Sequence, residues 1–187
     1  AEPSGDGGDL RAGAPGIGKS TLSLQITESL SKQKKFVLYV CGEESPEQIS
    51  HRAERIGLKQ ENVIFFPETN IRNIENYVAS HNDKIDLIFI DSIQTMYEPS
   101  TMSTTGSVSQ IAECTNVITN LAKGFGIITF IIGHITKTGD IAGPMILEHM
   151  VDTVLMFEGD KRNELRILHV EKNRFGPSDE VGIFKMT

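Results

Sequence analysis

The sequence predicts an α/β fold with a mainly parallel central sheet flanked by helices. The apolar runs are short and continuous rather than alternating, which is typical of strands that are covered on both faces. Helical segments separate the first four runs, and this alternation favours right-handed crossovers between parallel strands. The chain has 187 residues, and 39% of them are hydrophobic. This length and composition predict that residues 1–187 form a single domain with a sizeable core.

Seven apolar runs are predicted strands, at residues 36–40, 63–66, 87–90, 127–132, 153–157, 166–170 and 181–184. The predicted helices cover residues 21–30, 45–56, 71–80 and 108–123. The second helix opens with Ser45, Pro46 and Gln48, a pattern similar to a capping box, and Gly124 and Gly126 end the fourth. No long helix separates the last three strands, so we expect antiparallel additions or a hairpin at one edge of the sheet.

Composition excludes several classes of function. A net charge of −7 argues against binding nucleic acid through a broad basic surface, although it leaves room for a local basic loop. Cys41 and Cys114 have no metal-ligand spacing, and we interpret them as buried thiols of a cytoplasmic protein. We expect no membrane association, because there is no run of 18 apolar residues and no signal-peptide pattern at the N-terminus.

The stretch "GAPGIGKST" matches the phosphate-loop pattern G-x-x-x-x-G-K-[ST] from Gly13 to Ser20. In such a loop the backbone N–H groups point at phosphate oxygens, the lysine reaches the β- and γ-phosphates and the serine holds Mg²⁺. The alternative is a chance glycine turn before a helix. The candidate residues for binding ATP or ADP are Gly13, Ala14, Pro15, Gly16, Ile17, Gly18, Lys19, Ser20 and Thr21.

The segment before this loop fits less well. A phosphate loop normally follows a buried strand, but only Leu10 and Ala12 are apolar in "GDGGDLRA". Either the strand is very short, or the native N-terminal part is missing or altered.

Two further strands end in carboxylates. Asp91 closes "DLIFID" as a Walker B aspartate would, positioned for the Mg²⁺ shell, and the alternative is a helix N-cap. Glu43 and Glu44 follow the strand at 36–40, and one of them is a candidate for orienting or deprotonating a water that attacks the γ-phosphate. Adjacent residues do not face the same site, so the other is solvated or caps the next helix.

Two long polar loops, residues 97–107 and 134–147, directly follow strand ends. Loops at the carboxyl ends of parallel strands carry the site in α/β folds.

Together these stretches identify a family resemblance. The segments "PGIGKST", "YVCGEES", "DLIFIDSIQTMYEP", "GHITKTGDIAGPMILEHMVDTVLMFEGD" and "KNRFGPSDEVGIFKM" resemble the ATPase domain of the bacterial RadA (Sms) family, RecA-like proteins of DNA repair and recombination. The resemblance spans residues 15 to 186, and "KNRFG" is its most specific part. Ala14 departs from the family pattern, which has an aspartate there. The family's zinc finger and Lon-protease-like domain are absent from these 187 residues.

The resemblance implies a hexameric, ATP-driven motor that acts on single-stranded DNA and promotes branch migration of recombination intermediates. It also implies a role for several residues. Glu43 rather than Glu44 aligns with the catalytic glutamate of related helicases. Lys172 and Arg174 look like the cations that one subunit supplies to its neighbour's γ-phosphate. Two apart on a strand, they project to one face.

The two polar loops correspond to DNA-facing loops in RecA-like proteins. His134 is then a candidate γ-phosphate sensor that acts on the second loop. The DNA-binding candidates in that loop are Lys137, Thr138 and Gly139. The alternatives are a satisfied polar residue at a strand end for His134 and a solvated charge for Lys137.

Two other functions fit the same fold. One is an ATP-dependent phosphotransferase that acts on protein, of the clock type, which DNA would not stimulate. The other is a nucleotide-gated assembly scaffold with negligible turnover.

Overall fold

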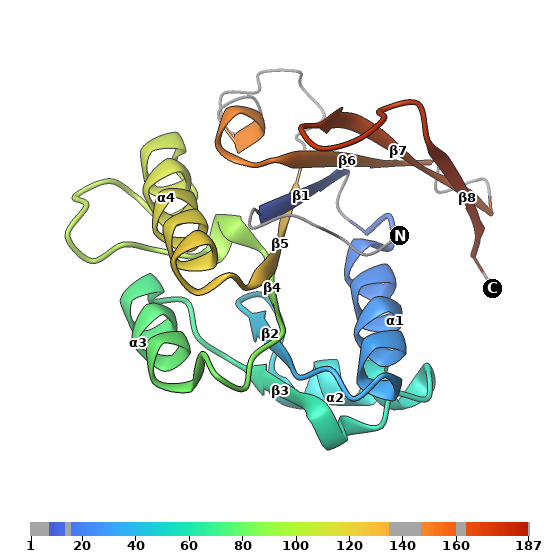
Figure 1. Ribbon diagram of the computed structural model, residues 1–187, viewed down its shortest axis with the longest axis horizontal. Helices are drawn as coiled ribbons and strands as arrows, with labels where there is room; N and C mark the ends of the chain where they lie inside the picture. The colour runs from blue at the N-terminus through green and yellow to red at the C-terminus, as the bar shows by residue number, and fades with distance from the viewer. Residues whose placement is uncertain (1–7, 14–15, 135–146, 160–163, 187) are drawn as a thin grey trace.

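The computed structural model describes residues 8–13, 16–134, 147–159 and 164–186, which form a central sheet flanked by helices (Figure 1). The sheet has the strand order β3-β2-β4-β5-β1-β6-β7-β8. Its strands are β1 (Gly8–Gly13), β2 (Val37–Cys41), β3 (Val63–Phe66), β4 (Leu87–Asp91), β5 (Ile128–His134), β6 (Thr153–Glu158), β7 (Leu165–Asn173) and β8 (Val181–Lys185). The labelled helices are α1 (Lys19–Lys32), α2 (Pro46–Arg55), α3 (Ile71–His81) and α4 (Val108–Phe125), with 3₁₀ turns η1 (Gln60–Asn62) and η2 (Ile93–Thr95). Residues 147–150 are also helical.

The predicted fold class is confirmed, with one correction at the C-terminal strands. Strands β1 to β6 pair in parallel. Strands β7 and β8 are antiparallel additions at one edge, as expected. The prediction was wrong for β6, which pairs in parallel with β1, so the parallel part of the sheet extends one strand further.

Strand β1 is the strand that the sequence before the phosphate loop only weakly indicates. It runs through all six residues of "GDLRAG" and lies between β5 and β6. Hydrogen bonding to a neighbour on each side stabilises an extended backbone whose residues have little strand propensity of their own, so tertiary context decides this element.

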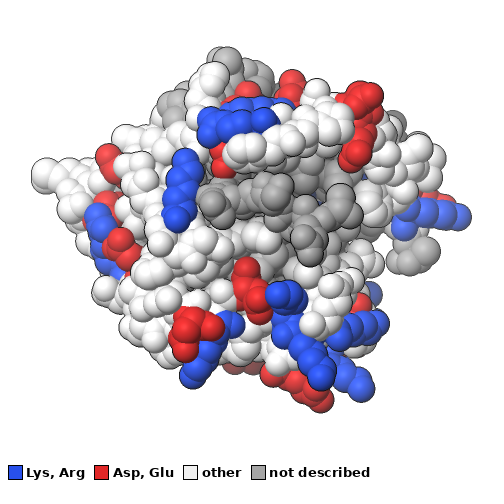
Figure 2. All heavy atoms as spheres, in the orientation of Figure 1, with Lys and Arg blue, Asp and Glu red and all other residues white. Residues whose placement is uncertain are grey.

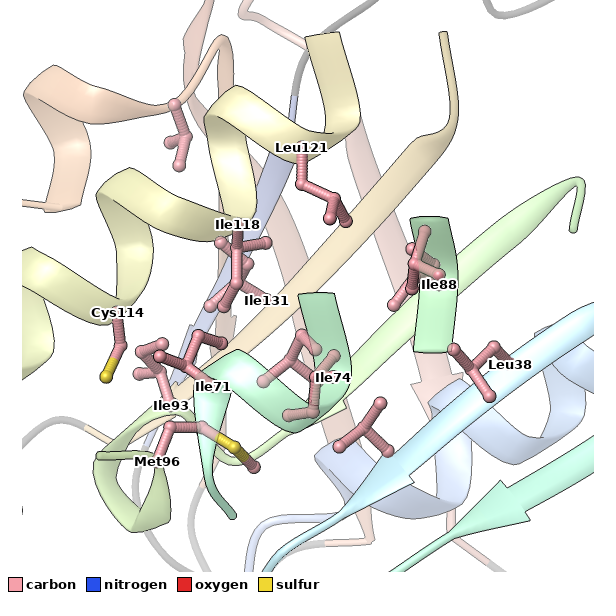
Figure 3. Close-up of a cluster of buried hydrophobic side chains, with 14 of the residues drawn as sticks. Leu38, Ile71, Ile74, Ile88, Ile93, Met96, Cys114, Ile118, Leu121 and Ile131 are labelled. Carbon is pink, nitrogen blue, oxygen red and sulfur yellow. The ribbon is translucent and has the colours of Figure 1, made fainter. Parts of the chain in front are cut away.

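Alternate residues of the central strands point to opposite faces of the sheet. Leu38 and Val40 of β2 join the core beneath α3 and α4, whereas Val37, Tyr39 and Cys41 join the core with α1 and α2. Figure 3 shows side chains from α3 and α4 directed toward those of β4 and β5. Because both faces are covered, the strands need continuous rather than alternating apolar sequence.

The helix ends follow from local chemistry. Ser45 and Gln48 form the predicted capping box at the start of α2. Gly126 ends α4 in the left-handed conformation, with φ of 66°, which a side chain would disfavour. Cys41 and Cys114 are free and buried, as predicted. No helix among the described residues is long and apolar enough to cross a membrane.

Truncating Phe89, which is fully buried between the rings of Tyr39 and Phe130, should destabilise the fold strongly. We expect Phe89→Ala to lower the free energy of unfolding by about 3–5 kcal/mol, because the cavity adds to the lost burial. Urea denaturation followed by circular dichroism measures this. Phe125→Ala, at a position that is 43% exposed, is the matched control and should change it by less than about 1 kcal/mol. Equal effects would contradict the placement of this core.

Candidate functional site

The register of the parallel strands brings the predicted site residues to one edge of the sheet. Gly13, the last residue of β1, lies opposite His134 at the end of β5. Asp91, the last residue of β4, lies opposite Cys41 at the end of β2, and Glu43 follows two residues later. The carboxyl ends of four neighbouring strands therefore surround one region, as expected for the binding edge of an α/β sheet.

Glycines shape the phosphate loop where it leaves β1. Gly16 and Gly18 have φ values of 73° and 112°, which side chains disfavour. A Cβ on Gly13 would lie 2.4 Å from the carbonyl oxygen of Phe157, so the strand end has no room for a side chain. Helix α1 begins at Lys19, two residues earlier than expected, which directs its N-terminal N–H groups at the loop.

Lys19 is folded onto its own loop. Its buried Nζ donates a hydrogen bond of 2.6 Å to the carbonyl of Gly13. Burial lowers the pKa of Lys19 to about 8, and the carboxylates of Asp91 and Glu43 limit that decrease. The ammonium group therefore lies within electrostatic reach of both predicted carboxylates.

Asp91 is buried at the end of β4, where a carboxylate needs a hydrogen-bond partner. The hydroxyl of Tyr39 donates to its Oδ2 at 2.7 Å. Burial, reinforced by the charge of Asp91, raises the pKa of Tyr39 well above its usual value, so the hydroxyl remains a donor. The N-cap position of η2 belongs to Ser92 rather than Asp91, which argues against the helix-cap alternative.

The two adjacent glutamates point in different directions. Glu43 accepts hydrogen bonds from the Ser92 hydroxyl and from Nε2 of His134, the latter at 2.8 Å. Glu44 instead pairs with Arg52 of α2. The His134 hydrogen bond is the main reason that the pKa of Glu43 falls to about 2; Ser92 and the charge of Lys19 act in the same direction, and burial opposes them.

The hydrogen bond between Glu43 and His134 connects the segment after β2 to the start of the second polar loop, residues 134–147. The side chain of Gln94, on η2, donates to the carbonyl of His134 at 3.3 Å. Nδ1 of His134 and Oε1 of Gln94 are both buried without a hydrogen-bond partner in the described structure. Polar atoms of this kind mark a place where water or a ligand group completes the hydrogen bonding.

Lys172 and Arg174 lie at the other end of the sheet from the phosphate loop. Lys172 is opposite Val154 of β6, which is level with Leu10 in β1, three residues before Gly13. Those three residues span about 10 Å along the strand, and Lys172 lies two strands away from β1. Lys172 therefore lies away from the phosphate loop of its own chain.

Both cations contact the segment 148–152. Nζ of Lys172 donates to the carbonyls of Glu148 and Val151 at 2.6 and 2.7 Å. Arg174 forms an ion pair of 2.6 Å with the buried carboxylate of Asp152. The expectation that both residues lie on one strand was wrong, because β7 ends at Asn173 and Arg174 follows it. The two side chains nevertheless contact the same segment.

The turn after these cations is organised by Asn173. Its Oδ1 accepts from the N–H of Phe175 at 3.2 Å, and its Nδ2 donates to the carbonyl of Pro177 at 3.1 Å. Phe175 itself is 62% exposed. Asn173 thus orders the turn that presents Arg174 and Phe175.

The buried side chain of Gln110 in α4 holds the first polar loop, residues 97–107, through hydrogen bonds to its backbone. Its amide nitrogen donates to the carbonyls of Glu98, Thr101 and Ser103, and its oxygen accepts from the N–H of Glu98. Met102 lies at the loop's tip with its side chain fully exposed.

Part of the prediction lies outside the described residues. Ala14 and Pro15 of the phosphate loop, and the DNA-binding candidates Lys137, Thr138 and Gly139, belong to this part. Ser20 and Thr21 lie in the first turn of α1, next to Lys19.

Sequence reasoning missed the residues that hold the site in place. Tyr39, Ser92, Gln110 and Asp152 contact predicted site residues or their loops. A tyrosine hydroxyl within a five-residue buried strand was a usable signal, because a buried hydroxyl needs a partner. Asp152 offered no comparable signal, since its partner is 22 residues away.

The fold is that of a RecA-like ATPase domain. The structure superimposes on a solved ATPase domain with a TM-score of 0.77 and 14% sequence identity, covering 95% of this chain and 80% of that one. Residues 9–140 match the family model described as AAA domain, and the chain belongs to this family.

Curated relatives confirm the resemblance read from the motifs. The DNA repair protein RadA of Chlamydia pneumoniae is 50% identical over 95% of this chain, and that of Bacillus subtilis (strain 168) is 48% identical over the same share. The chain spans 39% and 38% of the length of those two proteins.

The side chains present suit Mg²⁺ and a nucleotide. Mg²⁺ uses few protein ligands and takes the rest from phosphate and water, so one carboxylate and one hydroxyl, from Asp91 and Ser20, would be enough. Within the described part of the chain, no group of three or more His, Cys, Asp or Glu side chains is placed to hold a metal ion by itself.

The depressed pKa of Glu43 predicts a pH-dependent contribution to stability. A carboxyl whose pKa is about 2 in the folded chain and 4.5 in the unfolded chain stabilises the fold above pH 4.5, and this stabilisation is lost as the pH falls toward 2. We therefore expect the difference in free energy of unfolding between the wild type and Glu43→Gln to shrink as the pH is lowered through this window.

Chemical denaturation at a series of pH values measures that difference. Glu54→Gln, at a side chain that is 66% exposed, controls for the loss of a surface charge. A difference that grows as the pH falls would show that Glu43 is not held as an ionised acceptor.

Proposed function

We propose that this chain is the ATP-hydrolysing core of a DNA repair and recombination motor. The observation that carries the proposal is the convergence of Lys19, Asp91, Glu43 and His134 on one edge of the sheet. The names of the curated relatives, which are DNA repair proteins, support the process.

In the proposed reaction, the phosphate loop and Lys19 bind the β- and γ-phosphates, and Ser20 with Asp91 holds Mg²⁺. Glu43 orients the attacking water. With a pKa of about 2 in the resting chain, Glu43 is a weak base, so orientation rather than proton abstraction is its main contribution while His134 holds it.

His134 is the proposed link between nucleotide and DNA. In the resting chain it donates to Glu43 at 2.8 Å, and the γ-phosphate offers the competing acceptor. A shift of His134 from Glu43 to phosphate would free the glutamate for water. The same shift would move the start of the second polar loop, which begins at this residue.

A neighbouring subunit is proposed to complete the site with Lys172 and Arg174. Their position at the opposite end of the sheet from their own phosphate loop supports action in trans. Exposed apolar side chains on β7 and β8, among them Ile167, Val181 and Ile183, offer surface for a subunit contact. We propose the hexameric ring that the resemblance implies.

DNA contact is proposed at the polar loops rather than across the general surface. The face in Figure 2 carries Lys and Arg interspersed with Asp and Glu, without one broad basic area among its described residues. A few cations per subunit suffice when several subunits share one strand. Single-stranded DNA and recombination intermediates are the proposed partners, with branch migration in the cytoplasm as the task.

Glu43→Gln should abolish ATP turnover while retaining nucleotide binding, because the amide cannot act as base or hold water in the same way. Turnover is measured with and without single-stranded DNA in the full-length protein, and binding by calorimetry with Mg-ADP. We expect DNA to stimulate the wild type. Glu44→Gln, which removes the partner of Arg52, is the matched control and should retain most activity.

The two alternatives predict other results. A protein phosphotransferase would show phosphorylated Ser or Thr and no DNA stimulation. A scaffold would show nucleotide-dependent oligomers and the same negligible turnover with and without Glu43→Gln.

Mixing subunits tests whether Arg174 acts in trans. Arg174→Ala and Glu43→Gln should each be inactive alone, since a finger of this kind contributes about 10³-fold or more to turnover. In an equal mixture about a quarter of the interfaces combine an intact Glu43 with a neighbour's intact Arg174, so activity should reappear.

The Arg174→Ala protein must also bind Mg-ADP normally, which shows that its own site is intact. Asp152→Asn controls for the broken ion pair on the same segment. A mixture as inactive as its components would place Arg174 outside the neighbour's site.

A further inference from the structure

Arg166 is a buried cation next to the phosphate loop to which the reaction described above gives no role. It lies on β7 and is only 6% exposed. Its Nε donates a hydrogen bond of 3.0 Å to the carbonyl of Ile17, and its Nη1 donates to the carbonyl of Leu165 at 2.9 Å. The first contact joins segments far apart in sequence, because Ile17 lies within the loop that follows β1.

Apolar side chains near Arg166 pack β6 and β7 against this loop. Ile17 packs with Leu22 and Phe157 in a small apolar cluster, to which Leu168 of β7 adds. A Cβ on Gly159 would lie 2.6 Å from Cδ of Arg166, so glycine leaves the space that the guanidinium side chain occupies. Both packing and hydrogen bonds therefore restrict the position of the Arg166 side chain.

The hydrogen bond to Ile17 fixes the orientation of a whole peptide unit. The Ile17–Gly18 peptide unit is planar and trans, so the carbonyl of Ile17 and the N–H of Gly18 point in opposite directions. While Arg166 holds the carbonyl toward β7, the N–H of Gly18 points away from β7. Gly18 has φ of 112° and precedes α1, and it has no side chain to restrict rotation of this peptide unit.

We propose that Arg166 is a positioning residue of the phosphate loop, which keeps the N–H of Gly18 directed at the β-phosphate of a bound nucleotide. The inference rests on the proposed nucleotide-binding function. In this proposal, a residue of β7, which lies outside the phosphate-loop motif, helps to hold that motif in its binding conformation. Preorganised donors avoid the cost of reorienting the backbone when the nucleotide binds.

The test compares Arg166→Met and Arg166→Lys with the wild type in the full-length protein. Calorimetry with ADP and with AMP separates the β-phosphate from the rest of the nucleotide. We expect Arg166→Met to weaken ADP binding about tenfold, as the loss of one well-placed hydrogen bond does, and to leave AMP binding unchanged. Arg166→Lys, which keeps the charge and can reach one acceptor, should lie between the two.

A second readout needs no nucleotide. The amide resonance of Gly18 in NMR spectra should shift, and its hydrogen exchange should accelerate, in Arg166→Met. Arg72→Met, which removes an arginine that pairs with Glu75 and Glu98, is the control and should change neither quantity. Thermal unfolding confirms that each variant is folded.

The outcomes separate this inference from the function on which it rests. A wild type that binds no Mg-ADP overturns the proposed function and, with it, the role of Arg166. A wild type that binds ADP while Arg166→Met binds it equally well overturns the inference alone. Equal weakening of ADP and AMP would also overturn it, because Arg166 would then support the site as a whole rather than the β-phosphate contact. Should Arg166→Met fail to fold, Arg166→Lys carries the same comparison.

Discussion

Asp91 is a carboxylate at the end of a strand whose other four residues are buried and apolar, and its position requires compensation. Tyr39 provides it from the neighbouring strand, which fixes β2 beside β4 at their carboxyl ends. The same pairing places Glu43 and Ser92 together, and β5 brings His134 to them. The geometry of the candidate site therefore depends on how the sheet satisfies one buried charge.

Charged side chains of the candidate site are held by partners within the described chain. Lys19 holds the carbonyl of Gly13, and Glu43 holds Ser92 and His134. Arg174 holds Asp152 at the other end of the sheet. Under the proposed function, a phosphate or a neighbouring subunit would replace these partners. Replacement of partners offers a physical route by which nucleotide binding could change the loops and the subunit contacts together.

The sequence predicted the strands well because most are continuous apolar runs, and it predicted the site edge because glycines, a lysine and carboxylates follow those runs. It left β1 undecided, because its residues have little strand propensity, and it misjudged the direction of β6. Both elements depend on strands distant in the chain. From the sequence, only the family resemblance distinguished the role of Glu43 from that of Glu44. In the structure their partners distinguish them, because Glu43 binds His134 and Glu44 binds Arg52. Asp152 and Arg166 could not be identified, since their contacts are 22 and 149 residues away.

A crystal structure of the full-length protein with Mg²⁺ and a non-hydrolysable ATP analogue tests whether this network is the resting form of a Mg-nucleotide site. In that structure we expect Nζ of Lys19 to leave the carbonyl of Gly13 for a phosphate oxygen, and Asp91 to lie in the Mg²⁺ shell. Glu43, released from His134, should face the γ-phosphate. A nucleotide bound elsewhere, or one bound here with Lys19 still on Gly13 and Glu43 still on His134, would show that this network is not a nucleotide site.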